Sequence, residues 1–105
     1  MLELFQLLSD SNRYKMFVML YHDEYCVCDI MRFLSMKQAN VSKHIKRFKD
    51  LSLVTVRHDG KWVHYTLSLT ARKELHDLIN YMAQSPLYQE LTTLLLSFEK
   101  NQCIK

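Results

Sequence analysis

The spacing of apolar residues changes at about residue 53 of this chain and returns to the earlier pattern at about residue 69. Before residue 53 apolar side chains recur every three or four residues, as they do in helices. Two β-prone runs follow, residues 53–57 and 62–67, with Asp59-Gly60 between them. Asp-Gly between two such runs predicts a tight hairpin, in which both central residues take positive φ. The only glycine of the chain therefore stands where a turn requires it.

The helical spacing continues on both sides of the hairpin. Helices are expected at the start of the chain, then over 11–21 with Asp10 as cap, 26–34, about 38–51, 69–84, and from Pro86 onward. Four helices, a hairpin and two more helices predict a fold that is mainly α with a small β-hairpin, a winged helix-turn-helix. Residues 1–105 then form one domain, with the recognition helix at about 38–51 and the wing at about 53–67.

Composition points to a chain that pairs with a second copy. Hydrophobic residues make up 49% of its 105 residues, and a domain this small buries only a modest fraction of its surface. The apolar runs are far shorter than a membrane span, and no signal peptide is evident. We therefore expect a cytoplasmic protein with no membrane partner, whose three cysteines are reduced.

Charge is concentrated in the middle of the chain. Residues 1–31 carry a net charge of −3, residues 32–64 carry +6, and residues 65–105 carry none. A localised basic segment is typical of a phosphate-binding surface. An exposed charged face without any partner explains the same numbers equally well, so charge alone does not establish nucleic-acid binding.

The fourth predicted helix carries the candidate DNA-reading surface. With Val41, Ile45 and Phe48 facing inward, its polar side chains face outward. Amide side chains can contact adenine bidentately, and basic side chains can hold phosphates. The candidates on this helix and the wing are Lys37, Gln38, Asn40, Ser42, Lys43, His44, Lys46, Arg47, Arg57 and Lys61. Each alone is an ordinary exposed residue, but together with the helix-turn-helix pattern they predict binding of double-stranded operator DNA.

Two cysteines, Cys26 and Cys28, lie about ten residues before this helix. Thiolates select soft ions. On a regular helix, residues two apart point about 200° away from each other, so both can hold one ion only if the helix begins after Cys26 or unwinds there. Ligand binding would then reshape a helix that packs on the recognition helix. Cys103 is a candidate third thiolate. The alternatives are two buried structural thiols and a free thiol in the tail.

The sequence contains no arrangement typical of an enzyme. We find no Ser/His/Asp set, no paired carboxylates and no phosphate-binding loop. We therefore expect no enzymatic activity, no permanent cofactor and no small organic substrate. A small metal-handling protein, such as a metallochaperone, is an alternative that also uses a cysteine pair, but the basic helix and wing argue against it.

Four stretches of the chain resemble the ArsR/SmtB family of metal-sensing repressors, in matching order and spacing: residues 8–13, 25–30, 38–45 and 57–65. The resemblance implies a homodimer built on the first and last helices, which binds operator DNA without metal and releases it when a toxic metal or metalloid binds. On these two helices the expected interface residues are Leu4, Phe5, Leu8, Leu87, Leu91, Leu94, Leu95 and Phe98.

The Cys-Val-Cys-Asp box resembles that of the arsenite and antimonite sensors in this family. Met31 stands where those sensors often have a third cysteine, and Lys37 stands where the family usually has a serine that caps the recognition helix. The chain also lacks the N-terminal cysteine pair of cadmium and lead sensors and the paired Asp/His sites of zinc sensors. The resemblance thus implies As(III) or Sb(III) as inducer. The alternatives are another soft metal ion and oxidation of the cysteines.

Overall fold

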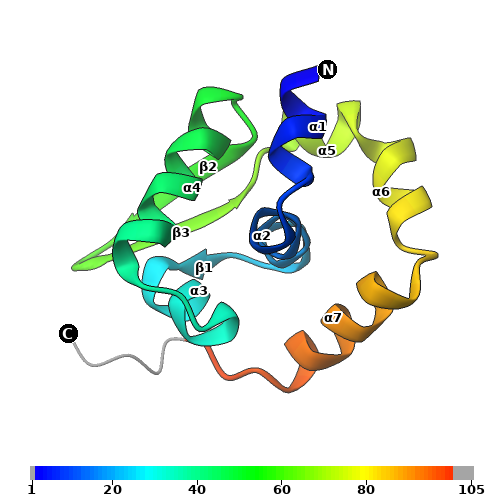
Figure 1. Ribbon diagram of the computed structural model, residues 1–105. Helices are drawn as coiled ribbons and strands as arrows, with labels where there is room; N and C mark the ends of the chain where they lie inside the picture. The colour runs from blue at the N-terminus through cyan, green and yellow to red at the C-terminus, as the bar shows by residue number, and fades with distance from the viewer. Residues whose placement is uncertain (1, 101–105) are drawn as a thin grey trace.

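The computed structural model describes residues 2–100, and Figure 1 shows how its elements are arranged. The elements are α1 (Leu2–Leu8), α2 (Ser11–His22), β1 (Tyr25–Cys26), α3 (Val27–Leu34), α4 (Gln38–Asp50), β2 (Val54–Asp59), β3 (Trp62–Leu67), α5 (Leu69–Glu74), α6 (His76–Met82) and α7 (Pro86–Ser97). The order α3, α4, β2, β3 is that of a helix-turn-helix followed by a wing, so the predicted fold class is confirmed. Among residues 2–100, no helix is long and apolar enough to span a bilayer.

Helix α2 lies at the centre of the fold. Its five consecutive residues from Met16 to Leu20 are all completely buried. In Figure 1 the helix is seen end-on, with α4 and the sheet on one side of it and α5 and α6 on the other. The side chain of Asp10 accepts a hydrogen bond from the backbone N–H of Arg13 at 3.1 Å, as expected for the predicted cap. A helix buried on all faces is the core around which the other elements pack.

The sheet has a third strand that the sequence did not indicate. Its antiparallel order is β1-β3-β2. Strand β1 has only two residues, and Cys26 pairs with His64 on β3, which in turn pairs with Arg57 on β2. Two residues are too few to show an alternating pattern, so this strand is visible only through its pairing. It places the first cysteine in one cross-strand row with the wing.

The hairpin turn differs from the prediction by one position. Asp59 pairs with Trp62, so the two central residues are Gly60 and Lys61 rather than Asp59 and Gly60. Only Gly60, with φ 60°, takes positive φ in this turn. This is the φ pattern of a turn that needs glycine at its first central position alone. The single glycine is still the residue that permits the turn.

The helix expected over residues 69–84 is two helices, so that prediction was wrong. Leu75, with φ −104° and ψ 14°, ends α5 and precedes α6. The N–H of Leu75 still reaches Ala71 O at 2.9 Å, and its C=O still accepts from Ile79 N at 2.8 Å. Because both backbone groups remain bonded and the side chain is buried, the break leaves no polar group unsatisfied. No glycine or proline marks it in the sequence.

Candidate functional site

Cys26 lies at the junction of a strand and a helix. It is the last residue of β1 and the N-cap of α3, with extended backbone angles of φ −83° and ψ 167°. The third helix therefore begins at Val27, between the two cysteines, and not at Cys26 as predicted. Both sulfurs can reach one ion only if the helix begins after Cys26 or unwinds there, and this structure meets the first condition. The backbone of Cys26 is extended, so its side chain need not point away from that of Cys28 as it would on a regular helix.

The two cysteines have different surroundings. Cys26 is 1% exposed, and its burial raises the pKa of its thiol. Cys28, in the first turn of α3, is half-buried and is disulfide-bonded, so it can act as a thiolate only after reduction. Within residues 2–100, no group of three His, Cys, Asp or Glu side chains is arranged to hold a metal ion. Cys103 lies outside the described residues.

The segment that follows α7 packs over this junction. We call Phe98, Glu99 and Lys100 the C-terminal clamp. The ring of Phe98 lies 6.1 Å from that of Tyr25 and 5.2 Å from that of Phe33, both in edge-on geometry. The guanidinium of Arg32 lies 4.7 Å over the Phe98 ring and donates to Glu99 O at 2.7 Å. The end of α7 is thereby joined to α3.

Lys100 extends the clamp to the residues before β1. Its Nζ lies 2.9 Å from Asp23 Oδ2 and 3.2 Å from the backbone oxygen of Glu24. It also lies 5.6 Å from the ring centre of Tyr25. These contacts join residues more than 70 positions apart, which no local pattern in the sequence indicates. They place the clamp beside the strand that carries Cys26.

The recognition helix α4 presents the predicted polar surface. Val41, Ile45 and Phe48 are buried, as expected. On the helix and its cap the predicted DNA contacts Lys37, Gln38, Asn40, Ser42, Lys43, Lys46 and Arg47 are exposed, and His44 is half-buried. Lys37 is the N-cap but makes no side-chain capping bond. Helix α3 packs directly against α4, so a change in α3 can reach this surface.

The two predicted DNA contacts on the wing differ in their partners. Lys61 is exposed in the turn. Arg57 is half-exposed and forms an ion pair with Glu24, the second residue before Cys26, with 3.0 Å between Arg57 Nε and Glu24 Oε1. This hydrogen bond lowers the pKa of the Glu24 carboxyl. No local pattern in the sequence indicates this pair, because its members are 33 positions apart.

The residues expected at a dimer interface differ in their exposure. Phe5, Leu87 and Leu94 are 56%, 45% and 51% exposed, so their apolar side chains are open to a partner. Leu4, Leu91 and Leu95 belong to the core of the protomer itself, and Leu8 is half-buried. Phe98 follows α7 as its cap and lies in the clamp. The exposed group lies on α1 and α7.

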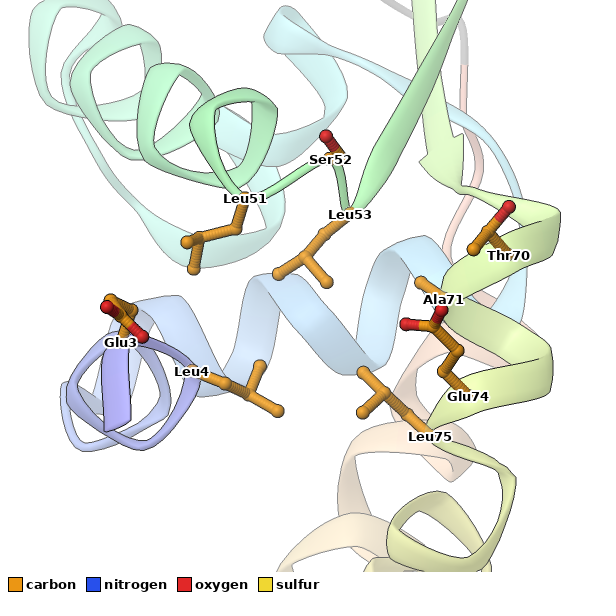
Figure 2. Close-up of a pocket in the computed structure, with 9 residues that line it drawn as sticks. All are labelled: Glu3, Leu4, Leu51, Ser52, Leu53, Thr70, Ala71, Glu74 and Leu75. Atoms are coloured by element: carbon orange, nitrogen blue, oxygen red, sulfur yellow. The ribbon is translucent and has the colours of Figure 1, made fainter. Parts of the chain in front are cut away.

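A hollow of about 330 Å³ lies on another part of the molecule (Figure 2). Leu4, Leu53 and Leu75 point into it, and the carboxylates of Glu3 and Glu74 stand at its edge. Its walls come from α1, the turn after α4, and the helix that follows the wing. None of the predicted DNA contacts lines it, and neither does Cys26 or Cys28.

Comparison with known sequences gives one family. The sequence model described as "Bacterial regulatory protein, arsR family" matches residues 10–56. The arsenical resistance operon repressor of Escherichia coli K12 is 37% identical over 68 residues, which cover 64% of this chain and 58% of that protein. CadC of Listeria innocua, a cadmium resistance transcriptional regulatory protein, is 44% identical over 62 residues, 58% of this chain and 52% of that protein.

A longer match is found in Staphylococcus xylosus. Its arsenical resistance operon repressor is 30% identical over 80 residues, which cover 76% of this chain and 70% of that protein. The chain spans a little over half the length of the first two relatives, and a larger share of this one.

Solved structures agree with the fold. Reduced HlyU from Vibrio cholerae has a TM-score of 0.67 at 25% identity, over 80% of this chain and 88% of that one. The homodimeric winged helix-turn-helix DNA-binding domain of Mb0332 from Mycobacterium bovis has a TM-score of 0.66 at 21% identity, over 81% and 79%. The second likeness concerns the fold alone.

Proposed function

Because this chain belongs to the ArsR family of bacterial regulatory proteins, we propose that it is a homodimeric repressor that releases operator DNA when arsenite or antimonite binds Cys26 and Cys28. One observation carries this proposal. The helix that packs on the recognition helix begins between the two cysteines, with Cys26 in extended geometry and Cys28 in the first helical turn. A ligand that draws the two sulfurs together therefore acts on the start of that helix.

The DNA surface in this proposal is the outer face of α4, with the wing. The exposed amide and hydroxyl groups of Gln38, Asn40 and Ser42 lie near its N-terminal end, which is the end that enters the major groove in most helix-turn-helix proteins. Exposed lysines and arginines further along supply phosphate contacts, and Lys61 in the turn of the wing reaches the neighbouring backbone. This distribution of polar groups favours binding of double-stranded DNA.

Release requires that the inducer favour a different arrangement of α3. Cys26 is buried, and its backbone N–H donates to the Asp29 carboxylate in the first turn of the helix. Joining Cys26 and Cys28 through one arsenic atom would draw Cys28 toward Cys26 and thereby shift α3 against α4. A coupling of about 1–3 kcal/mol between the two binding events is the usual allosteric magnitude, and it changes DNA affinity by about 5- to 150-fold.

We propose Cys103 as the third ligand, in place of the cysteine that Met31 replaces. Trivalent arsenic favours three thiolate sulfurs, and residues 2–100 offer only two cysteines. Lys100 lies three residues before Cys103, and its side-chain Nζ lies 3.2 Å from the backbone oxygen of Glu24, two residues before Cys26. Three extended residues span at most about 10 Å from the Lys100 backbone, so this side-chain contact supports the assignment. Cys103→Ser should then raise the arsenite concentration needed for release about tenfold or more, while an unchanged requirement would reject Cys103.

The proposed dimer uses the exposed apolar residues of α1 and α7. Phe5, Leu87 and Leu94 leave about half of their surface exposed, and burying them against a second copy would remove further apolar area from water. Two recognition helices related by twofold symmetry would then read two half-sites of an operator.

The direct test is fluorescence anisotropy on promoter DNA of the protein's own gene, titrated with arsenite under reducing conditions. We expect release at about one arsenite per subunit. Cys26→Ser should bind the DNA with unchanged affinity and fail to respond. Loss of response together with loss of DNA binding would point to misfolding, so Cys26→Ala serves as a second variant. A Cys26 variant that responds like the wild type overturns the proposal.

A second candidate keeps the DNA binding and replaces the metalloid by oxidation of Cys26, Cys28 or Cys103. The disulfide at Cys28 favours it, and the similar structure of HlyU from Vibrio cholerae is that of a reduced form. The two candidates separate in one experiment. Release of DNA by peroxide, reversed by dithiothreitol and insensitive to arsenite, supports the redox regulator. Release by arsenite with no response to peroxide excludes it.

A further inference from the structure

The wing arginine is occupied by an internal carboxylate. Arg57 Nε lies 3.0 and 3.2 Å from the two carboxylate oxygens of Glu24, and Arg57 Nη2 donates to the same group. The Nε–Nη2 edge of a guanidinium is one of the edges that grip a phosphate or carboxylate with two parallel hydrogen bonds. The remaining nitrogen, Nη1, lies 3.9 Å from Asp59 Oδ2.

We propose that Glu24 is an internal competitor of DNA phosphate for Arg57, and that it therefore sets the strength and the salt dependence of DNA binding by the wing. The inference rests on the proposed DNA binding and adds a residue that lies outside the helix-turn-helix and the wing. When the wing meets DNA, a phosphate competes with the Glu24 carboxylate for the Arg57 guanidinium, so only a part of the complexes contains the contact between Arg57 and phosphate.

The charges around Arg57 indicate that Glu24 competes with phosphate for the guanidinium and does more than orient the Arg57 side chain. Two carboxylates, Glu24 and Asp59, surround this one guanidinium, so the base of the wing carries no net positive charge while both pairs persist. A DNA phosphate can therefore bind the paired edge of the Arg57 guanidinium only after the Glu24 carboxylate has dissociated from it. The pair is also open to solvent, with side chains 52% and 28% exposed for Arg57 and Glu24. An exposed pair of this kind is weak enough to be exchanged.

The competitor stands on the chain segment that leads to the cysteines. Glu24 is followed directly by β1, whose Cys26 shares a cross-strand row with Arg57 through His64. Lys100 of the clamp holds the backbone oxygen of Glu24 at 3.2 Å. The backbone of Glu24 is therefore fixed on both sides, and its side chain is the part that is free to exchange partners.

The test measures DNA affinity of the full chain at several salt concentrations, without inducer, for wild type, Glu24→Gln, Arg57→Gln and the double variant. Glu24→Gln keeps the shape of the side chain and removes its charge. We expect it to bind own-promoter DNA about two- to fivefold more tightly at about 0.15 M salt. The slope of log affinity against log salt should steepen by up to about 0.9, the value for one whole phosphate contact, because Arg57 is then free of its competitor in every complex.

Two controls separate this effect from a general loss of negative charge. Glu74→Gln makes the same change on α5, at the edge of the hollow in Figure 2, and should leave affinity and slope at wild-type values. In an Arg57→Gln background, Glu24→Gln should have no effect. A Glu24→Gln variant with wild-type or weaker affinity overturns the inference, and so does an effect that persists without Arg57. If the wild type itself shows no salt-dependent DNA binding, the proposed function fails instead.

Discussion

The backbone N–H of Cys26 donates a hydrogen bond to the completely buried carboxylate of Asp29, with 3.3 Å between Cys26 N and Asp29 Oδ2. The other oxygen of Asp29 lies 3.2 Å from Arg32 Nη2. The same guanidinium holds Phe98 and Glu99 of the clamp. One carboxylate thus joins the start of α3 to the segment that follows α7.

Removing that carboxylate should loosen the junction. Asp29→Ala leaves the buried N–H of Cys26 without its acceptor, and an unsatisfied buried donor costs about 1–3 kcal/mol. Urea unfolding under reducing conditions measures the loss. Asp59→Ala, at an exposed site on the wing, is the matched control and should change the free energy of unfolding by less than about 0.5 kcal/mol. Equal effects of the two substitutions would contradict the role given to Asp29.

The missing cap of the recognition helix should be repairable. Lys37 has the extended backbone of an N-cap, φ −77° and ψ 150°, but its side chain accepts no hydrogen bond. Lys37→Ser supplies an acceptor there and should stabilise the fold by about 1 kcal/mol in thermal unfolding. Lys37→Ala removes the same charge without adding an acceptor, and should give no gain. A gain of equal size in both variants would show that charge, and not capping, is responsible.

The exposed residues of α7 should control assembly. Leu94→Glu places a charge on a side chain that is 51% exposed, so the protomer should still fold while the proposed dimer dissociates. Sedimentation equilibrium measures the molar mass in solution, and we expect a dimer for the wild type and a monomer for the variant. Leu69→Glu, at a 67% exposed position on α5, should remain dimeric. A dimeric Leu94→Glu variant with normal stability would place the interface elsewhere.

The response to pH should distinguish the inducers. Burial raises the pKa of the Cys26 thiol, so this thiol is protonated at neutral pH and must lose its proton when it binds a divalent cation. Each proton released makes cadmium affinity rise about tenfold per pH unit between pH 6 and 8. Arsenous acid instead forms its bonds to thiols with loss of water, since each As–OH takes up the thiol proton. Its affinity should therefore stay nearly constant over that range.

Isothermal titration at three pH values measures both affinities under reducing conditions. Cadmium and arsenite affinities that change with pH by the same factor would contradict this account of the site.

Much of the fold follows from local patterns. The helical spacing placed α2 and α4 to within one residue of their observed bounds, and Pro86 marked the start of α7. The Asp10 cap also marked the start of α2, whereas α4 has no capping side chain. The exposed polar face of α4 followed from the same spacing. The wing was predicted because glycine at a hairpin turn is a strong local signal, although the turn is centred one residue later.

The features that were missed depend on contacts between distant residues. The break at Leu75 has no glycine or proline to mark it in the sequence, and the leucine there is buried. The pair of Glu24 and Arg57 and the clamp over Tyr25 join positions far apart in the chain. Nothing in the sequence near either partner requires these contacts, so only the folded structure shows that the side chains meet.

In the proposed mechanism, binding of arsenite at Cys26 and Cys28 weakens binding of DNA at α4, and binding of DNA weakens binding of arsenite. The most direct measurement is the arsenite affinity of the reduced protein, alone and bound to its own promoter DNA, by isothermal titration. Because linkage is reciprocal, the factor by which DNA weakens arsenite binding must equal the factor by which arsenite weakens DNA binding. We predict a factor between about 5 and 150 in both directions. Equal arsenite affinity with and without DNA would contradict the claim, because a ligand with no preference between the two states cannot release DNA.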